Sequence, residues 1–324
     1  MVNFQTLAKP EQPQRYFDMA VKAAKQKADI AKNKVQRSSP TQKAIYIETQ
    51  HLDVMNKVLQ KHLGRLLTEF PRLEQLSAFY RSLCDLRFSS KEYHQKLGQL
   101  NWSISKIHNL TGMTINRIHR SKSIKEVIDA RQSFYGRASS ILNNLAETLQ
   151  FLEQCRKTLR GFPDIIDGQF TVCICGFPNV GKSTLLKKLT GANPEIANYA
   201  FTTKTLNTGY LTQGYATVQL VDTPGTLNRE KMNKVEQEAD IAIRYCANLL
   251  IYIFDLTEEY PLEQQYALLE YLETLGKPIL IYLSKTDLLD KQVISQFNER
   301  FKKDYKLYNL QELKGRLLEG AVKI

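Results

Sequence analysis

The chain has 324 residues, of which 43% are hydrophobic, so it is long enough to bury a sizeable core and to form two domains. Its net charge of +12 and pI near 9.3 favour an anionic partner. The sequence contains no apolar run of about 20 residues, and its N-terminus lacks a signal-peptide core, so we expect a cytoplasmic protein without a membrane span.

Five cysteines are scattered along the chain in an odd number and without the spacing of a zinc site. This pattern predicts free thiols, most of them buried, in a reducing compartment. The five are Cys84, Cys155, Cys173, Cys175 and Cys246.

Residues 15–160 show the period of helices, with apolar residues three and four apart and few prolines. We predict about five helices in an antiparallel bundle, the last two of them long. The predicted breaks are residues 38–42, 70–71, 88–92 and 119–123, with Ser90 and either Ser121 or Ser123 as N-caps. Trp102, the single tryptophan, is predicted to lie in the bundle core.

The positive charge is concentrated in this first half. Residues 1–160 hold 27 Lys and Arg against 13 Asp and Glu, whereas residues 161–324 hold 18 against 20. Each basic run alone is also compatible with a solvated face, but the imbalance favours contact with a phosphate backbone over an anionic membrane. The two main basic groups are Lys22, Lys25, Lys27, Lys32, Lys34 and Arg37, and Arg117, His119, Arg120, Lys122 and Lys125.

After residues 161–163, interpreted as a linker, strands alternate with helices. Strands are predicted at 170–175, 205–212, 216–221, 249–255, 279–283 and 306–308, and helices beginning at Gly181, near Glu230, at Leu262, at Lys291 and at Leu310. The predicted fold is an all-α helical domain (1–160) followed by a three-layer α/β domain (161–324) with a mostly parallel sheet.

The segment VCICGFPNVGKST (172–184) has the spacing of a phosphate-binding loop between a strand and a helix. Glycines at 176 and 181 let backbone N–H groups approach phosphate oxygens, Lys182 reaches the outer phosphates, and the Ser183 hydroxyl ligates Mg²⁺. The predicted nucleotide contacts in this loop are Gly176, Phe177, Pro178, Asn179, Val180, Gly181, Lys182, Ser183 and Thr184.

Two further segments complete the phosphate side. Asp222, at the end of an apolar strand, is predicted to support Mg²⁺ through water, and the Gly225 N–H to meet the γ-phosphate. In the polar segment 199–205, Thr203, or its neighbour Thr202, is predicted to complete the Mg²⁺ shell when the γ-phosphate is present. Lys182, Thr203 and Gly225 are the predicted catalytic residues.

Ser284, Lys285 and Asp287 follow another apolar strand, about 100 residues after the phosphate loop. A carboxylate here can accept hydrogen bonds from the N1–H and 2-amino groups of guanine, which adenine lacks, while the Lys285 stem packs on the base. Asp287 therefore favours GTP and GDP as ligands and argues against an ATPase.

The second half resembles the Obg-type GTPases, whose switch region reads F-T-T, and nearly the whole chain resembles the Nog (nucleolar GTP-binding protein) family in its short archaeal-like form. The resemblance is carried by FPRLEQLSAFYRSLCD, CRKTLRGFPDIID, ICGFPNVGKST, NYAFTTKTLNTGY and QLVDTPGTLNRE. It implies a role in assembly of the large ribosomal subunit, with the helical domain and the G domain docking on precursor rRNA of the pre-ribosomal particle.

The sequence departs from the usual G-protein pattern at two places. Ser284 replaces an asparagine that bridges the base and the phosphate loop, which should weaken guanine binding, and Thr226 and Leu227 leave no glutamine to orient water. We therefore expect slow intrinsic hydrolysis. Asn179 matches the K⁺-coordinating asparagine of potassium-activated G-proteins, although an asparagine that merely braces the loop fits equally.

These observations predict a monomeric GTP-hydrolysing switch, in which loss of the γ-phosphate releases the segments around Thr203 and Gly225 and the helical domain passes the change to rRNA. The alternative is an RNA-binding placeholder on the pre-ribosome, with the nucleotide as a structural ligand and negligible hydrolysis.

Overall fold

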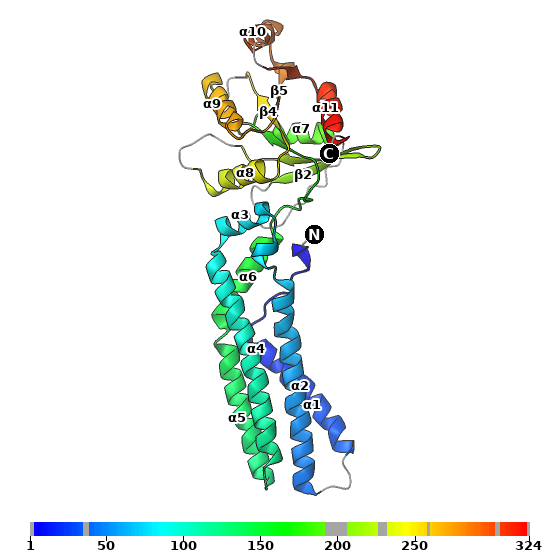
Figure 1. Ribbon diagram of the computed structural model, residues 1–324, viewed down its shortest axis with the longest axis vertical. Helices are drawn as coiled ribbons and strands as arrows, with labels where there is room; N and C mark the ends of the chain where they lie inside the picture. Colours follow the sequence, from blue (N-terminus) through cyan, green and yellow to red (C-terminus); the bar gives the residue numbers. More distant parts are fainter. Residues whose placement is uncertain are drawn as a thin grey trace. The chain divides into compact units, whose positions relative to one another are not determined.

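The computed structural model describes residues 3–34, 39–191, 206–225, 232–257, 260–301 and 305–322 (Figure 1). The chain forms two compact units, one of residues 2–75 and 87–160 and the other of residues 76–86 and 161–324. The sequence did not suggest that residues 76–86 group with the second half of the chain. No helix in the described ranges is both long and apolar enough to span a bilayer.

Within the described part of residues 1–160 there are six α-helices rather than the predicted five. They are α1 (Pro13–Lys34), α2 (Pro40–Glu69), α3 (Ala78–Arg87), α4 (Ser90–His119), α5 (Ile124–Asn143) and α6 (Ala146–Arg160), with short 3₁₀ turns η1 (Phe4–Thr6) and η2 (Leu73–Gln75). The longest are α2 and α4, with 30 residues each. The fourth predicted helix corresponds to α4 and is long as predicted, whereas the prediction of a long fifth helix is wrong, because the chain divides there into α5 and α6. The missed break, at residues 144–145, contains neither Gly nor Pro.

Serine caps set the starts of the long helices. Ser39 caps α2 in a capping box with Gln42, and Ser123 caps α5 by accepting a hydrogen bond from the Glu126 N–H. The cap of α4 is Ser89 and not the predicted Ser90, because the Ser89 hydroxyl accepts from the Glu92 N–H at 3.2 Å.

The core of the helical unit runs along the faces that α2, α4 and α5 turn towards one another. On α4 the buried aliphatic and aromatic positions are Tyr93, Leu100, Ile104, Ile107 and Ile118. Trp102 lies two residues from Leu100 and from Ile104, which places it on the opposite face, and it is 59% exposed. The prediction of a core tryptophan is therefore wrong.

The second unit contains a six-stranded sheet in the order β2-β3-β1-β4-β5-β6, with β2 antiparallel to β3 and the other pairs parallel. The strands are β1 (Thr171–Cys175), β2 (Asn207–Gln213), β3 (Ala216–Asp222), β4 (Leu249–Phe254), β5 (Ile279–Leu283) and β6 (Leu307–Tyr308). All six lie within two residues of the predicted bounds, and the predicted fold class is confirmed.

Helices cover both faces of this sheet. They are α7 (Lys182–Thr190), α8 (Lys234–Tyr245), α9 (Leu262–Glu273), α10 (Lys291–Phe301) and α11 (Leu310–Val322). Helices α7 and α11 pack on β2 and β3, while Cys173 of β1 and Tyr252 of β4 contact α8 and α9 on the other face. The helix predicted near Glu230 begins at Lys234; Glu230 itself lies outside the described residues.

The segment 161–163 is packed rather than an open linker. Phe162 and Pro163 are buried, and the Tyr80 hydroxyl of α3 donates to the carbonyls of Pro163 (2.9 Å) and Ile165 (3.3 Å) while accepting from the Ile165 N–H. Because these groups hold α3 against the chain that leads into β1, residues 76–86 belong to the second unit.

All five cysteines are free, as predicted, and four of them are buried. Burial raises the pKa of the Cys155, Cys175 and Cys246 thiols to about 12, so they stay protonated and unreactive near neutral pH.

Candidate nucleotide-binding site

The predicted phosphate loop joins β1 to α7. Its backbone takes left-handed conformations at Asn179 (φ 61°) and Gly181 (φ 94°), and Gly181 is the residue that caps α7. These conformations turn successive N–H groups towards one side of the loop, at the positive end of the helix dipole. The loop therefore has the backbone shape of an anion site, and Phe177 and Val180 anchor it in the core.

Lys182 lies across this loop. Its ammonium group donates to the carbonyls of Phe177 (2.6 Å) and Gly176 (3.1 Å), and only 7% of the residue is exposed. Burial lowers the pKa of Lys182, and the nearby Asp222 carboxylate partly opposes that shift. A buried cation at the mouth of an anion-binding loop is well placed to interact with phosphate.

Asp222 is the last residue of β3. Its Oδ2 accepts from the Ser183 hydroxyl (2.6 Å) and from the Asn207 side-chain amide (3.3 Å), while its buried Oδ1 has no hydrogen-bond partner among the described residues. Burial raises the pKa of Asp222 despite these hydrogen bonds. A hydroxyl and an unsatisfied carboxylate oxygen form the oxygen donor set that Mg²⁺ prefers, so these residues fit the predicted metal.

Gly225 follows this strand and lies against the phosphate loop. A Cβ atom on Gly225 would come within 2.5 Å of the Pro178 nitrogen, so only glycine allows this approach. Gly225 and Pro178 both line a cavity of about 450 Å³. The cavity is lined by Pro178, Asn179, Lys182, Ser183, Asn207, Asp222, Thr223, Pro224, Gly225, Asn233, Val235 and Glu236.

The predicted base-reading residues follow β5. Ser284 is buried beside the phosphate loop, since its Cβ lies 3.8 Å from a Cβ built on Gly181, and its hydroxyl donates to the Phe254 carbonyl (3.0 Å). Lys285 takes a left-handed conformation (φ 51°), and Asp287 is exposed in the short turn η3 (Thr286–Leu288).

Asp255, a residue that was not predicted from the sequence, orients Lys285. The Lys285 ammonium group lies 2.6 Å from the carboxylate of Asp255, which follows β4 and is 2% exposed. Burial acts to raise the pKa of Asp255, but hydrogen bonds from Lys285 and Thr257 hold it below its usual value. The side chain of Gln265 brackets the same turn, accepting from the Asp255 N–H and donating to its carbonyl.

Sequence reasoning missed Asp255, Asn207 and the N-terminus of α8. Asp255 had a usable signal, because it is an acidic residue at the carboxyl end of an apolar strand, where α/β domains bind ligands. Asn207 and Glu236 had none, since their place in the cavity depends on how β2 and α8 pack.

The structure thus brings the phosphate loop together with Asp222 and Gly225, and places Ser284 beside the loop. Thr184 lies exposed in the first turn of α7. Thr202, Thr203, Thr226 and Leu227 lie outside the described residues.

Comparison with known proteins agrees with this geometry. Residues 171–285 match the family model described as a 50S ribosome-binding GTPase, and residues 4–167 match that of the NOG1 N-terminal helical domain. The second match covers half of the chain.

Individual relatives extend over both matches. An uncharacterized protein of Methanocaldococcus jannaschii is 32% identical over 85% of this chain and 79% of its own length. Nucleolar GTP-binding protein 1 of Drosophila melanogaster is 31% identical over 84% of this chain, which spans only 44% of that longer protein. A solved nucleolar GTP-binding protein 1 from Plasmodium falciparum is 25% identical, with a TM-score of 0.36, over 50% of this chain and 89% of its own. The chain belongs to the NOG1 family of nucleolar GTP-binding proteins and carries its P-loop GTPase domain behind its helical domain.

Proposed function

We propose that this protein binds GTP, hydrolyses it to GDP and phosphate, and acts as a switch in assembly of the large ribosomal subunit. The observation that carries the proposal is the cluster of Lys182, Ser183 and Asp222 at the phosphate loop, where one buried carboxylate oxygen has no described partner. A nucleoside triphosphate and its bound metal ion would supply the phosphate charges for Lys182 and the cation for Asp222.

Each residue then has a role in the reaction. Bound Mg²⁺ supplies charge neutralisation at the β- and γ-phosphates. Ser183 and Thr203 would hold it, with Asp222 supporting it through water, while Lys182 stabilises the negative charge that develops during attack by water. The Gly225 N–H would meet the γ-phosphate, and Gly225 lies against Pro178 of the phosphate loop.

Guanine selectivity rests on Asp287, oriented by the turn after β5, and on Lys285, which Asp255 holds by its ammonium group. The test is competition between GTP and ATP for the purified protein with magnesium. We expect GTP and GDP to bind and ATP to compete poorly. Equal binding of both nucleotides would refute the proposal.

Potassium is the proposed activator. Asn179 lines the cavity, and its backbone is left-handed (φ 61°). We expect GTP turnover to be faster in KCl than in NaCl at equal ionic strength, and Asn179→Ala to remove the difference. Equal rates in both salts would leave Asn179 as a brace of the loop.

Precursor rRNA of the large subunit is the proposed partner of the basic helices. Support comes from the +14 balance of residues 1–160 and from the ribosome-binding description of the matched GTPase model. We further propose that the protein acts as a monomer in the cytoplasm.

One observation favours the second candidate, an RNA-binding placeholder. The Ser284 hydroxyl is bonded to the Phe254 carbonyl and so does not link the base region to the phosphate loop as an asparagine would. Lys182→Ala distinguishes the two functions: if the variant supports subunit maturation as well as the parent does, the placeholder is correct, and if maturation fails, the switch is.

A further inference from the structure

Helix α4 carries an exposed aromatic and cationic face that the GTPase site does not use. The Lys106 ammonium lies 5.4 Å from the centre of the Trp102 ring, and that tryptophan is 59% exposed. Large aromatic side chains are seldom left this open to water, because burying them is favourable.

The exposed pair continues along the helix. Successive residues of an α-helix are separated by 100°, so positions 102, 106, 113, 117 and 120 fall within about 60° of one another and extend over roughly 27 Å. We call this surface the α4 face; its members are Trp102, Lys106, Met113, Arg117 and Arg120, and all are exposed.

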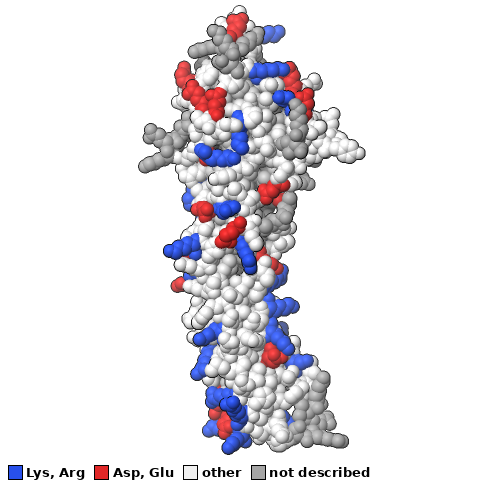
Figure 2. Space-filling model, viewed as in Figure 1, with Lys and Arg blue, Asp and Glu red and all other residues white. Residues whose placement is uncertain are grey.

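The charge along the α4 face is of one sign. Between Glu92 and Glu126 the sequence has no acidic residue in 33 positions but six Lys and Arg. Among the described side chains none forms an ion pair with Lys106, Arg117 or Arg120. On the face drawn in Figure 2, Lys and Arg side chains are spread along the helical unit, with Asp and Glu side chains between them.

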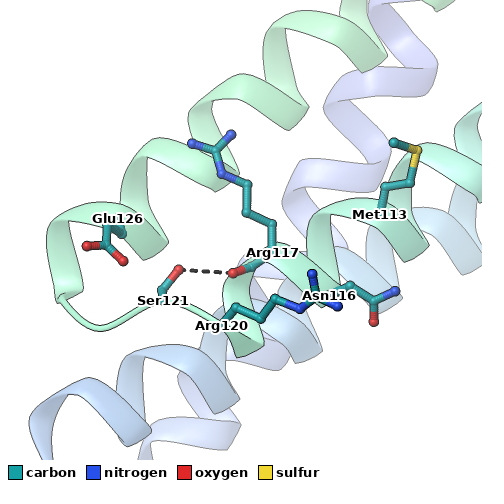
Figure 3. A pocket seen from close by; sticks show the side chains of 6 residues that line it. All are labelled: Met113, Asn116, Arg117, Arg120, Ser121 and Glu126. Atoms are coloured by element: carbon teal, nitrogen blue, oxygen red, sulfur yellow. Dashed lines mark hydrogen bonds between the residues drawn. The ribbon is translucent and has the colours of Figure 1, made fainter.

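At its C-terminal end the α4 face opens into a pocket of about 440 Å³ (Figure 3). Arg117 and Arg120 both line this pocket. The Arg120 side chain extends towards Asn116, whereas the Arg117 guanidinium points away from Asn116. Glu126, the acidic residue at its rim, lies in the first turn of α5 and accepts a hydrogen bond from the Lys122 N–H at 2.8 Å.

We propose that the α4 face binds an unpaired stretch of RNA, with one base stacked on Trp102 and the flanking phosphates held by Lys106, Arg117 and Arg120. The choice of RNA as the ligand rests on the proposed function. Stacking on an aromatic ring between cations is how proteins hold single strands, whereas a duplex hides its base faces.

An anionic membrane fits the α4 face less well. Interfacial helices bury a continuous apolar face. The only large apolar residues of the α4 face are Trp102 and Met113, which lie 11 positions apart and are separated by polar residues.

The experiment uses Trp102 itself as the probe, because it is the only tryptophan in the chain. The full-length protein is titrated with an oligoadenylate of about ten nucleotides, a length within the usual single-strand site size, and with the same strand annealed to its complement. We expect the single strand to quench Trp102 emission and the duplex to leave it nearly unchanged.

Variants give the second readout, by anisotropy of a labelled oligoadenylate. We expect Trp102→Ala to weaken binding about tenfold and Trp102→Phe to retain most of it, because one stacked base contributes a free energy of that order. Arg117→Ala with Arg120→Ala should reduce the salt slope by about two. Lys61→Ala, an exposed lysine of α2, is the matched control and should change affinity little.

Three results would overturn the inference: binding without a change in Trp102 emission, equal affinity of Trp102→Ala and parent, or a blue shift with phosphatidylserine vesicles and no response to RNA. Circular dichroism checks that each surface variant is folded. Lys182→Ala separates this inference from the proposed function. If the variant no longer binds GTP but RNA still quenches its Trp102 emission, the α4 face binds RNA independently of the nucleotide site. If the parent protein binds GTP but RNA does not quench Trp102, the α4 inference is wrong and the proposed switch is unaffected.

Discussion

At the scale of single residues, Ser284 stands where G-proteins usually have an asparagine. Its Cβ lies next to the phosphate loop, but its short side chain ends in a hydrogen bond to the Phe254 carbonyl. An asparagine at this position has the length to reach from the base region to the loop.

We predict that Ser284→Asn tightens GTP and GDP binding by about tenfold. The reason is that the asparagine adds one hydrogen bond between neutral groups in a buried site, whose free energy corresponds to a change of that size in the dissociation constant. Binding of a fluorescent guanine nucleotide at equilibrium measures it. Ser295→Asn, the same substitution at an exposed position of α10, is the control. Unchanged or weaker binding by Ser284→Asn would show that the serine is not the limiting contact.

A second residue, His51, makes the helical unit sensitive to acid. It is buried and hydrogen-bonds the Tyr135 hydroxyl, and burial, with the charges of Arg131 and Lys25, lowers its pKa from 6.5 to about 4. Between these two values the unfolded chain binds a proton that the folded chain does not, so stability falls as the pH falls.

We therefore expect the free energy of unfolding of the helical unit to drop by up to about 3 kcal/mol between pH 7 and pH 4 through this residue. Urea unfolding followed by helical circular dichroism measures the drop. His51→Gln should flatten it, whereas His119→Gln, at an exposed site, should not. The same acid dependence in His51→Gln would assign it to other groups.

At the scale of elements, α3 is the helix whose place the chain order does not suggest. It lies between helices of the bundle in sequence but packs with residues 161–166 through Tyr80, whose ring also stacks on Phe162 at 6.4 Å. One buried hydroxyl thus shares its single proton between two carbonyls and accepts a hydrogen bond from one N–H.

Removing that hydroxyl leaves these backbone groups buried without their partner. We predict that Tyr80→Phe lowers the free energy of unfolding of the unit that contains the sheet by about 1–3 kcal/mol. Thermal unfolding with and without GDP locates the loss in that unit. Tyr46→Phe, on an exposed ring, is the control, and an equal effect of both variants would contradict the role of the Tyr80 hydroxyl.

At the scale of the whole molecule, the excess positive charge and the candidate nucleotide site lie in different halves of the chain. The first 160 residues carry the +14 balance, and the remaining residues carry −2 together with the candidate nucleotide site. This division predicts that RNA affinity and its salt dependence come from the first half.

We expect Lys125→Ala, an exposed lysine at the start of α5, to reduce the slope of log affinity against log salt by about one. Lys188→Ala, equally exposed on α7, should leave the slope unchanged. Binding of labelled RNA by the full chain at several salt concentrations measures both. Equal slopes for the two variants would mean that the RNA surface is not confined to the first half.

Much of this molecule was predictable from local pattern. Strand positions followed from continuous Val, Ile and Leu runs, because a buried parallel strand needs apolar side chains on both faces. The phosphate loop was identifiable from residues 176–183 because its geometry depends on glycine, lysine and serine at fixed spacing within one segment.

Contacts between distant segments were not predictable in this way. The partner of Lys285 is Asp255, thirty residues earlier, and the partner of Tyr80 is the chain around Pro163. Trp102 was misplaced because its hydrophobicity suggested burial, whereas its position on the turn of α4 relative to Leu100 and Ile104 decided its exposure.

The amino-acid order by itself therefore determined the element types, the order of the two domains and the identity of the phosphate loop, since each depends on residues close together in the chain. Only the tertiary structure decided which carboxylate oxygen lacks a described partner, which helix packs against the chain around Pro163 and which aromatic ring faces water. Those properties depend on packing between segments that no local pattern encodes.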